Sequence, residues 1–118
     1  MIDVTIYRTD DGKIRAFTLS GHADFAKRGK DIVCAGVSAV SFGAINAVMK
    51  LTNVKPTIQQ GEKGGYLHCE VPLIEDRHTE EKVQLLLEGM IVSLQTIERD
   101  YGKYVKLTTK SLGGETKC

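Results

Sequence analysis

The chain has 118 residues, which is long enough for one domain with a single hydrophobic core but not for two. Hydrophobic residues make up 42% of it, charged residues make up 26%, and the net charge of +1 gives no argument for nucleic acid as a partner of the whole surface. The start MIDVTIYR goes straight into alternation and no apolar run approaches the ~18–20 residues of a membrane span, so we expect neither a signal peptide nor a membrane segment.

The first twenty residues predict a β-hairpin. Apolar side chains occupy every second position from Ile2 to Ile6, as in a strand with one buried face. Asp10-Asp11-Gly12 is typical of a turn, because glycine adopts positive φ freely. The segment from Ile14 to Ser20 then predicts the second strand of the hairpin.

A polar loop and a long helix are expected next. Residues 21 to 30 lack the apolar period of either element, and a loop of this length in a compact domain is often functional. From Asp31 to Leu51 the chain predicts a buried helix, with Asp31 near its start. Small residues recur every fourth position, a ridge that lets a sheet face or a partner helix come close. The members of this ridge are Ala35, Ala39, Gly43 and Ala47.

Two further strands are predicted in the middle of the chain. Pro56 to Gln60 is short and poorly apolar, and Tyr66 to Leu73 alternates with its apolar side chains, Leu73 included, facing one way. Pro72 cannot donate a hydrogen bond to a ladder, so it marks either an edge strand or the end of a strand.

The last part of the chain predicts an amphipathic helix and a final strand. Asp76 and Thr79 are candidate N-caps for a helix that runs to Tyr101, with Gly102 as the residue after its end. Lys103 to Thr109 alternates as a strand. The apolar stripe of the helix consists of Val83, Leu87, Met90, Leu94, Ile97 and Tyr101.

The expected architecture is therefore α+β, in the order β-β-α-β-β-α-β. A mostly antiparallel sheet with two helices packed on one face buries these apolar stripes economically. We expect a single domain over residues 1–109 and a polar C-terminal tail over residues 110–118.

Three cysteines bear on compartment and chemistry. An odd count at irregular spacing, in a chain that needs no staple, argues for free thiols and a cytoplasmic protein. Cys34 lies at the predicted start of the helix, where orphan N–H groups favour the thiolate and could also stabilise an oxyanion. Free cysteine is more commonly a small buried hydrophobe, and the surrounding Ile32-Val33-Cys34-Ala35 fits that interpretation well.

His22 follows the second strand directly, twelve positions before Cys34. If the loop folds back, His22 could act as the base for Cys34, or it could be exposed and idle at a strand end. Gly21 would let backbone or substrate approach closely, and Asp31 could orient His22, cap the helix, or both. Ser38 lies one turn beyond Cys34 on the same helical face, where it could line a site or permit close packing.

Other chemistry has weaker support. Adjacent strand residues point to opposite faces, so His68 and Cys69 cannot both ligate one metal without distortion, and no metal-ligand spacing is present. A redox or metal sensor using Cys34 and Cys69 stays a third hypothesis. The basic loop residues Lys27, Arg28 and Lys30 would make only a weak, salt-sensitive contact with an anionic surface.

The motif G-H-A, then a polar loop, then G-x-D-I-V-C-A-x-x-S resembles the bacterial ribosomal-processing cysteine protease family, Prp. The matching positions are Gly21, His22, Ala23, Gly29, Asp31, Ile32, Val33, Cys34, Ala35 and Ser38. The match continues through Ser41, Phe42, Asn46, the pair Gly64-Gly65 and the run from Ser93 to Glu98. It covers roughly residues 1 to 109, so the tail with Cys118 receives no role from it.

The resemblance implies a Cys–His endopeptidase that removes the N-terminal extension of ribosomal protein L-twenty-seven, after a pair of aromatic residues, before that protein joins the large subunit. It implies Cys34 as nucleophile, His22 as base, and Gly21, Asp31 and Ser38 as supporting residues. A homodimer and a loop that orders over the substrate are also implied. Neither a cofactor nor a metal is expected, and neither membrane nor direct nucleic-acid binding is predicted. The alternative is a non-catalytic ribosome-associated binding module.

Overall fold

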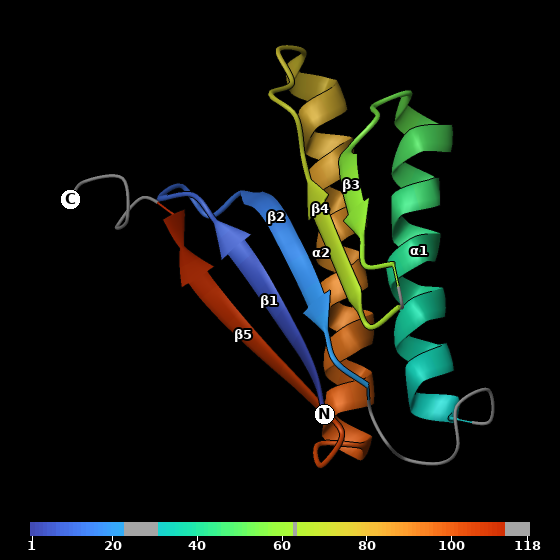
Figure 1. Cartoon of the computed structure of the whole chain (residues 1–118). Helices are drawn as coiled ribbons and strands as arrows, with labels where there is room; N and C mark the ends of the chain where they lie inside the picture. Colours follow the sequence, from blue (N-terminus) through green and yellow to red (C-terminus); the bar gives the residue numbers. More distant parts are fainter. Residues whose placement is uncertain (23–30, 63, 113–118) are drawn as a thin grey trace.

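The computed structural model describes residues 1–22, 31–62 and 64–112. Its elements, in chain order, are β1 (Ile2–Arg8), β2 (Ile14–Ser20), α1 (Ile32–Thr52), β3 (Thr57–Gln60), β4 (Tyr66–Glu70), α2 (Arg77–Asp100) and β5 (Val105–Ser111). The strands form one sheet in the order β3-β4-β2-β1-β5, and the two helices lie behind it on one face (Figure 1). The predicted α+β class and element order are confirmed.

The sheet is mostly antiparallel, as predicted. β2 pairs antiparallel with both β1 and β4, and β4 pairs antiparallel with β3. β5 runs parallel to β1, with Ile2 opposite Val105 and Arg8 opposite Ser111. The predicted hairpin is present, and its register shifts by one position between Tyr7 and Arg8. Consequently β1 and β2 lie in the interior of the sheet.

Two strands differ from their predicted bounds. β4 ends at Glu70, and Leu73 is 81% exposed, so the expectation that Leu73 faces inward is wrong. The last ladder contact on that side is the Val71 N–H donating to the Arg15 carbonyl at 2.8 Å, and Pro72, which follows, cannot donate. Pro72 therefore marks a strand end, and the sheet edge is β3. At the other edge, β5 runs to Ser111 because its pairing with β1 continues that far.

The second helix fully buries four of the six residues of its predicted apolar stripe, and the last two, Ile97 and Tyr101, are half-buried. Val83, Leu87, Met90 and Leu94 are all at most 3% exposed, so this face closes over the sheet. Asp76 is the N-cap: its side chain accepts the Thr79 N–H at 2.9 Å. Thr79 is therefore inside the helix, where its hydroxyl donates to the same carboxylate.

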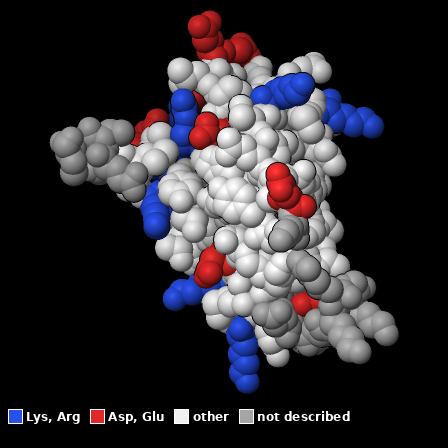
Figure 2. Space-filling view, in the orientation of Figure 1, with Lys and Arg blue, Asp and Glu red and all other residues white. Residues whose placement is uncertain are grey.

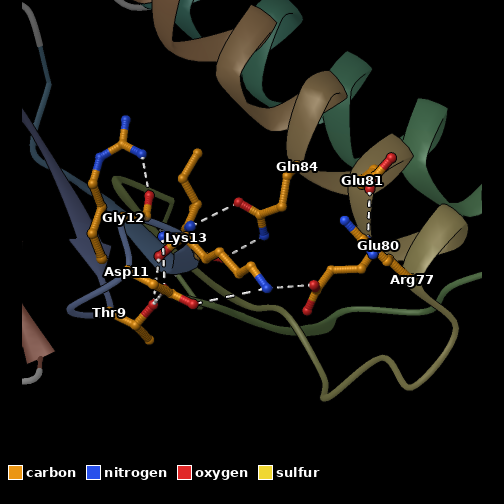
Figure 3. A network of polar contacts seen from close by, with 10 residues as sticks. Thr9, Asp11, Gly12, Lys13, Arg77, Glu80, Glu81 and Gln84 are labelled. Carbon is orange, nitrogen blue, oxygen red and sulfur yellow. Dashed lines mark hydrogen bonds and ion pairs between the residues drawn. The ribbon is translucent and has the colours of Figure 1, made fainter.

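A polar network ties the β1–β2 turn to the start of α2 (Figure 3). Gln84 Oε1 accepts the Ile14 N–H at 2.8 Å, and Gln84 Nε2 donates to the Ile14 carbonyl at 2.9 Å. Lys13 Nζ lies 2.5 Å from Glu80 Oε1. The side chain of Gln84 thus satisfies both backbone groups of the first residue of β2, which fixes the helix along the hairpin.

The first helix buries a different face from the one that carries most of its small-residue ridge. It buries Val33, Val37, Ser41, Ile45 and Val48, whereas the small residues Ala35, Ala39 and Gly43 are exposed. Gly36 lies on the side of α1 toward α2, where an added Cβ would be 3.7 Å from Ile97 Cδ1, an ordinary van der Waals distance. Among the described residues, these three members of the predicted ridge therefore lie outside the buried face of α1, while the fourth, Ala47, is half-buried.

By length and composition alone, α1 is also apolar enough to cross a membrane. Its most apolar 18-residue window has a mean hydropathy of 1.9, and 28% of that window is buried. The expectation that no segment reaches such a length is therefore wrong for this helix. Core helices of soluble proteins meet the same criterion, so the finding is weak support for a membrane segment.

The sheet face away from the helices is open. Thr5, Thr18, His68 and Gln59 lie side by side across four strands there, according to the register of the pairs. Figure 2 looks onto this face and shows lysine and arginine interspersed with aspartate and glutamate, mostly toward its margin. Within the described residues, this face therefore shows mixed charge rather than one basic patch.

Candidate active site

The end of β2 and the beginning of α1 lie at the same end of the molecule (Figure 1). A cavity of about 320 Å³ opens there, and His22 and Cys34 both line it together with Gly21 and Ser38. The structure therefore brings four of the five predicted site residues to one cavity. The fifth, Asp31, is buried at the start of α1 with 7% of its surface exposed.

Asp31 holds both the helix start and the thiol. Its Oδ1 accepts the N–H groups of Val33 at 2.9 Å and Cys34 at 3.1 Å, which makes it the N-cap of α1. Its Oδ2 accepts the Cys34 thiol, with Sγ at 3.5 Å. The prediction that Asp31 caps the helix is confirmed, and the same carboxylate fixes the direction of the Cys34 side chain.

Three of the N–H groups that could stabilise an oxyanion at the start of α1 already have partners in the chain. Besides the two N–H groups that donate to Oδ1, the Ala35 N–H donates to the Asp31 carbonyl at 3.1 Å. The N–H groups of Val33, Cys34 and Ala35 are thus engaged within the chain. A charge that develops on a bound carbonyl would need donors from elsewhere.

Gly21 occupies a backbone position that no other residue fits. Its φ is +96°, in the left-handed region, and an added Cβ would lie 2.3 Å from the Met1 carbonyl oxygen. Its N–H donates to the Gly65 carbonyl at 2.8 Å. The close backbone approach predicted at Gly21 is therefore real, and its partners are the first residue of the chain and the β3–β4 turn.

The cavity has an apolar wall that the sequence analysis missed. It consists of Ile2, Leu19, Val37, Phe42 and Leu67. These residues come from β1, β2, α1 and β4, and only the alternation of each element signals them individually. Gln60, Gly61 and Tyr66 also line the cavity. Such a cavity fits a peptide that presents an apolar side chain beside Cys34.

Cys69 does not belong to this site. It is fully buried in β4, opposite Phe17 on one side and Ile58 on the other. Burial, and secondarily the negative charge of Glu70, raises the pKa of the Cys69 thiol to about 11. Cys69 therefore keeps its proton at neutral pH and is a poor partner for a redox sensor with Cys34.

The remaining candidates add no metal site. His68 Nε2 lies 3.1 Å from Glu70 Oε1 in the same strand. Across residues 1–22, 31–62 and 64–112, no group of three histidine, cysteine or acidic side chains gathers as metal ligands would. Lys27, Arg28, Lys30 and the predicted ordering of their loop lie outside the described residues, as does Cys118.

Sequence comparison relates the chain to one protease family. The profile of the family described as cysteine protease Prp matches residues 1–106. The ribosomal processing cysteine protease Prp of Bacillus subtilis (strain 168) is 52% identical over 109 residues, which cover 92% of this chain and 97% of that protein. A protein of the same name from Staphylococcus aureus (strain Mu50) is 44% identical over 110 residues, covering 93% and 100%.

Solved structures give the same relation. The S. aureus protein described as an essential ribosomal processing protease Prp, in complex with a covalently linked product peptide, has a TM-score of 0.86 and 42% identity, covering 93% of this chain and all of that one. The same protease with a substrate peptide has a TM-score of 0.79 and 41% identity, with the same coverage.

Proposed function

The chain belongs to the cysteine protease Prp family, and from this membership we propose that it removes the N-terminal extension of ribosomal protein L-twenty-seven during assembly of the large subunit. Membership makes the chain a cysteine protease; the substrate and the roles of individual residues are the proposal. One observation carries it: Cys34 and His22, twelve positions apart in the chain, line one cavity.

The proposed reaction has two steps at Cys34. His22 accepts the thiol proton as Sγ attacks the scissile carbonyl carbon, which forms a tetrahedral intermediate. The C–N bond then breaks, His22 protonates the departing amine, and a thioester joins the N-terminal extension to Sγ. Water next attacks the thioester with His22 as base, which releases the carboxylate and restores the thiol.

Asp31 and Ser38 have supporting roles in this proposal. The Asp31 carboxylate accepts a hydrogen bond from the Cys34 thiol, with Sγ 3.5 Å from Oδ2, and this contact holds Sγ in place. The negative charge of the carboxylate strengthens that hydrogen bond. Ser38 is exposed one helical turn after Cys34 and lines the cavity, where its hydroxyl can meet the peptide backbone.

The apolar wall supports the proposed cleavage after aromatic residues. Phe42 from α1 and Leu67 from β4 belong to this wall, together with Ile2, Leu19 and Val37. An aromatic side chain buries a large apolar area and would favour such a cavity over solvent. We propose that this wall receives a residue that precedes the cleaved bond.

A homodimer in the cytoplasm is part of the proposal. The exposed small residues Ala35, Ala39 and Gly43 leave one side of α1 open to close approach by a second copy. An apolar helix with only 28% of its most apolar window buried gains stability when a partner covers it. Free thiols at irregular spacing suit a reducing cytoplasm.

The test is cleavage of extended L-twenty-seven by wild-type protein, Cys34→Ala and His22→Ala, with mass identification of the cut bond. We expect Cys34→Ala to lose detectable cleavage and His22→Ala to lose at least ~100-fold in rate. Cys69→Ala is the matched control, because its thiol lies outside the cavity. Undiminished cleavage by either cavity variant would end the dyad assignment. Binding without cleavage by wild type would favour the non-catalytic module.

A further inference from the structure

A glycine of the β3–β4 turn lies directly against the ring of His22. If Gly65 carried a side chain, its Cβ would lie 2.8 Å from His22 Nε2 and 3.3 Å from His22 Cε1. Atoms of these kinds do not pack that closely, so a Cβ at residue 65 and the ring cannot keep their present places together. We infer that Gly65 is a positioning residue. Because Gly65 has no side chain, the His22 ring can occupy the position from which it acts on Cys34.

The same glycine also holds the backbone before His22. The Gly65 carbonyl accepts the Gly21 N–H at 2.8 Å, so the turn is bonded to the residue that carries the chain into His22. Within the turn, the Gly64 N–H donates to the Gly61 carbonyl, and the Gly61 N–H donates to the Tyr66 carbonyl, both at 3.2 Å. Hydrogen bonds therefore fix both the backbone that precedes His22 and the turn that lies against its ring.

Gly21 and Gly65 answer different needs. A Cβ at Gly21 would meet the Met1 carbonyl, which is backbone and cannot turn away. A Cβ at Gly65 would meet the far end of a side chain, which can rotate. The Gly65→Ala variant should therefore fold, with His22 displaced and the Met1 contact kept. Since this role acts through His22, it rests on the proposed Cys34–His22 chemistry.

The first experiment compares Gly65→Ala with Gly12→Ala. Gly65 has φ of +74° and Gly12 has φ of +87°, so alanine strains the backbone at both, but a Cβ at Gly12 meets nothing within 4 Å. We expect similar losses of thermal stability from the two variants. For cleavage of an extended L-twenty-seven peptide, we expect kcat of Gly65→Ala to fall ~10- to 100-fold with KM within about twofold. Gly12→Ala should keep wild-type kcat.

A second readout does not need the substrate. Ring carbon–proton NMR signals of His22, assigned with His22→Ala, should shift in Gly65→Ala. In Gly64→Ala these signals should keep their wild-type positions. Gly64 has a similar φ of +75°, but a Cβ there would meet nothing within 4 Å. If wild type cleaves no ribosomal-protein peptide, the proposed function fails while this ring measurement still decides whether Gly65 sets the position of His22.

A double-mutant cycle separates positioning from general damage. The rate at which iodoacetamide alkylates Cys34 is measured in wild type, Gly65→Ala, His22→Ala and the double variant. If Gly65 acts through His22, Gly65→Ala changes the rate in the wild-type background and leaves it unchanged in the His22→Ala background. An equal change in both backgrounds, unmoved ring signals, or an equal loss of kcat in Gly12→Ala would overturn the inference.

Discussion

At the scale of single residues, Asp31 joins two tasks in one carboxylate. One oxygen accepts two N–H groups of α1, and the other accepts the Cys34 thiol. The helix start and the direction of the thiol are therefore coupled, and losing the side chain should affect both. Substitutions that keep one oxygen can separate the two tasks.

We predict different outcomes for Asp31→Ala and Asp31→Asn. The alanine variant loses the cap and should be less stable by ~0.5–2 kcal/mol, whereas asparagine keeps a side-chain oxygen and should be less stable by at most about 0.5 kcal/mol. Urea denaturation measures both. Peptide cleavage by Asp31→Asn then reports the role of the charge alone, and wild-type rates there would reduce Asp31 to a cap.

The buried thiol gives a prediction on pH. Burial raises the pKa of Cys69 from its ordinary 9.0 to about 11 in the folded chain. A folded-state pKa above the unfolded value stabilises the fold below pH 9, and that contribution disappears as the pH rises through about 11. The unfolding free energy of wild type should thus fall more steeply across this window than that of Cys69→Ala. Parallel curves would show that Cys69 is not desolvated.

At the scale of elements, α2 is held to the hairpin by the side chain of Gln84, which forms hydrogen bonds with the backbone as a neighbouring strand would. Gln84 offers Ile14 both an acceptor and a donor, at 2.8 and 2.9 Å. Figure 3 shows this pair beside the ion pair of Lys13 with Glu80. Because β2 carries His22 at its far end, this attachment also supports the site from the opposite end of the strand.

We predict that Gln84→Ala destabilises the fold by ~1–3 kcal/mol, because it leaves two part-buried backbone groups without partners. Gln95→Ala, at an exposed position of the same helix, is the control and should stay within ~0.5 kcal/mol of wild type. Thermal or urea unfolding monitored by circular dichroism measures both. Equal stabilities of the two variants would contradict the prediction.

The elements also show which parts of the fold can be predicted from the sequence. Val83, Leu87, Met90 and Leu94 recur at helical spacing, so α2 and its buried face were predictable from local pattern alone. The ends of β4 and β5 were not, because pairing with neighbouring strands decides them and no apolar signal marks Lys110 or Ser111.

The candidate site likewise contains residues that can be predicted from the sequence and contacts that cannot. His22, Cys34 and Asp31 carry reactive or capping groups, so residue type and position pointed to them. The apolar wall and the contact of Gly65 with His22 join elements far apart in the chain, and no local pattern encodes which of them meet. The partner of the ridge on α1 stayed open for a related reason: small residues indicate close packing but not whether a sheet face or another helix provides it.

At the scale of the whole molecule, α1 keeps apolar surface exposed within the described part of the chain. Ile32 is 57% exposed and Leu51 is 67% exposed at its two ends, and the small residues between them face outward. A helix this apolar in contact with water carries a cost that a second copy would remove. The proposed homodimer accounts for that surface.

We therefore predict that Ala39→Glu weakens self-association. A buried, unpaired carboxylate at a close helix contact disfavours the dimer, so sedimentation velocity should show more monomer at equal concentration. Val92→Glu on α2 is the control, because Val92 is 61% exposed and lies outside the ridge. A wild type that is monomeric at every concentration would contradict the proposed dimer directly.

The central claim is that Cys34 becomes acylated by the N-terminal part of its substrate. Extended L-twenty-seven is mixed with enzyme, and samples are quenched in acid at intervals. The intact mass of the enzyme is measured in each sample, and peptide mapping then locates any added mass. We predict a transient gain equal to the released extension less one water, on the peptide that contains Cys34 and absent from Cys34→Ala. Cleavage that proceeds without this adduct, or an adduct on Cys69, would contradict the account.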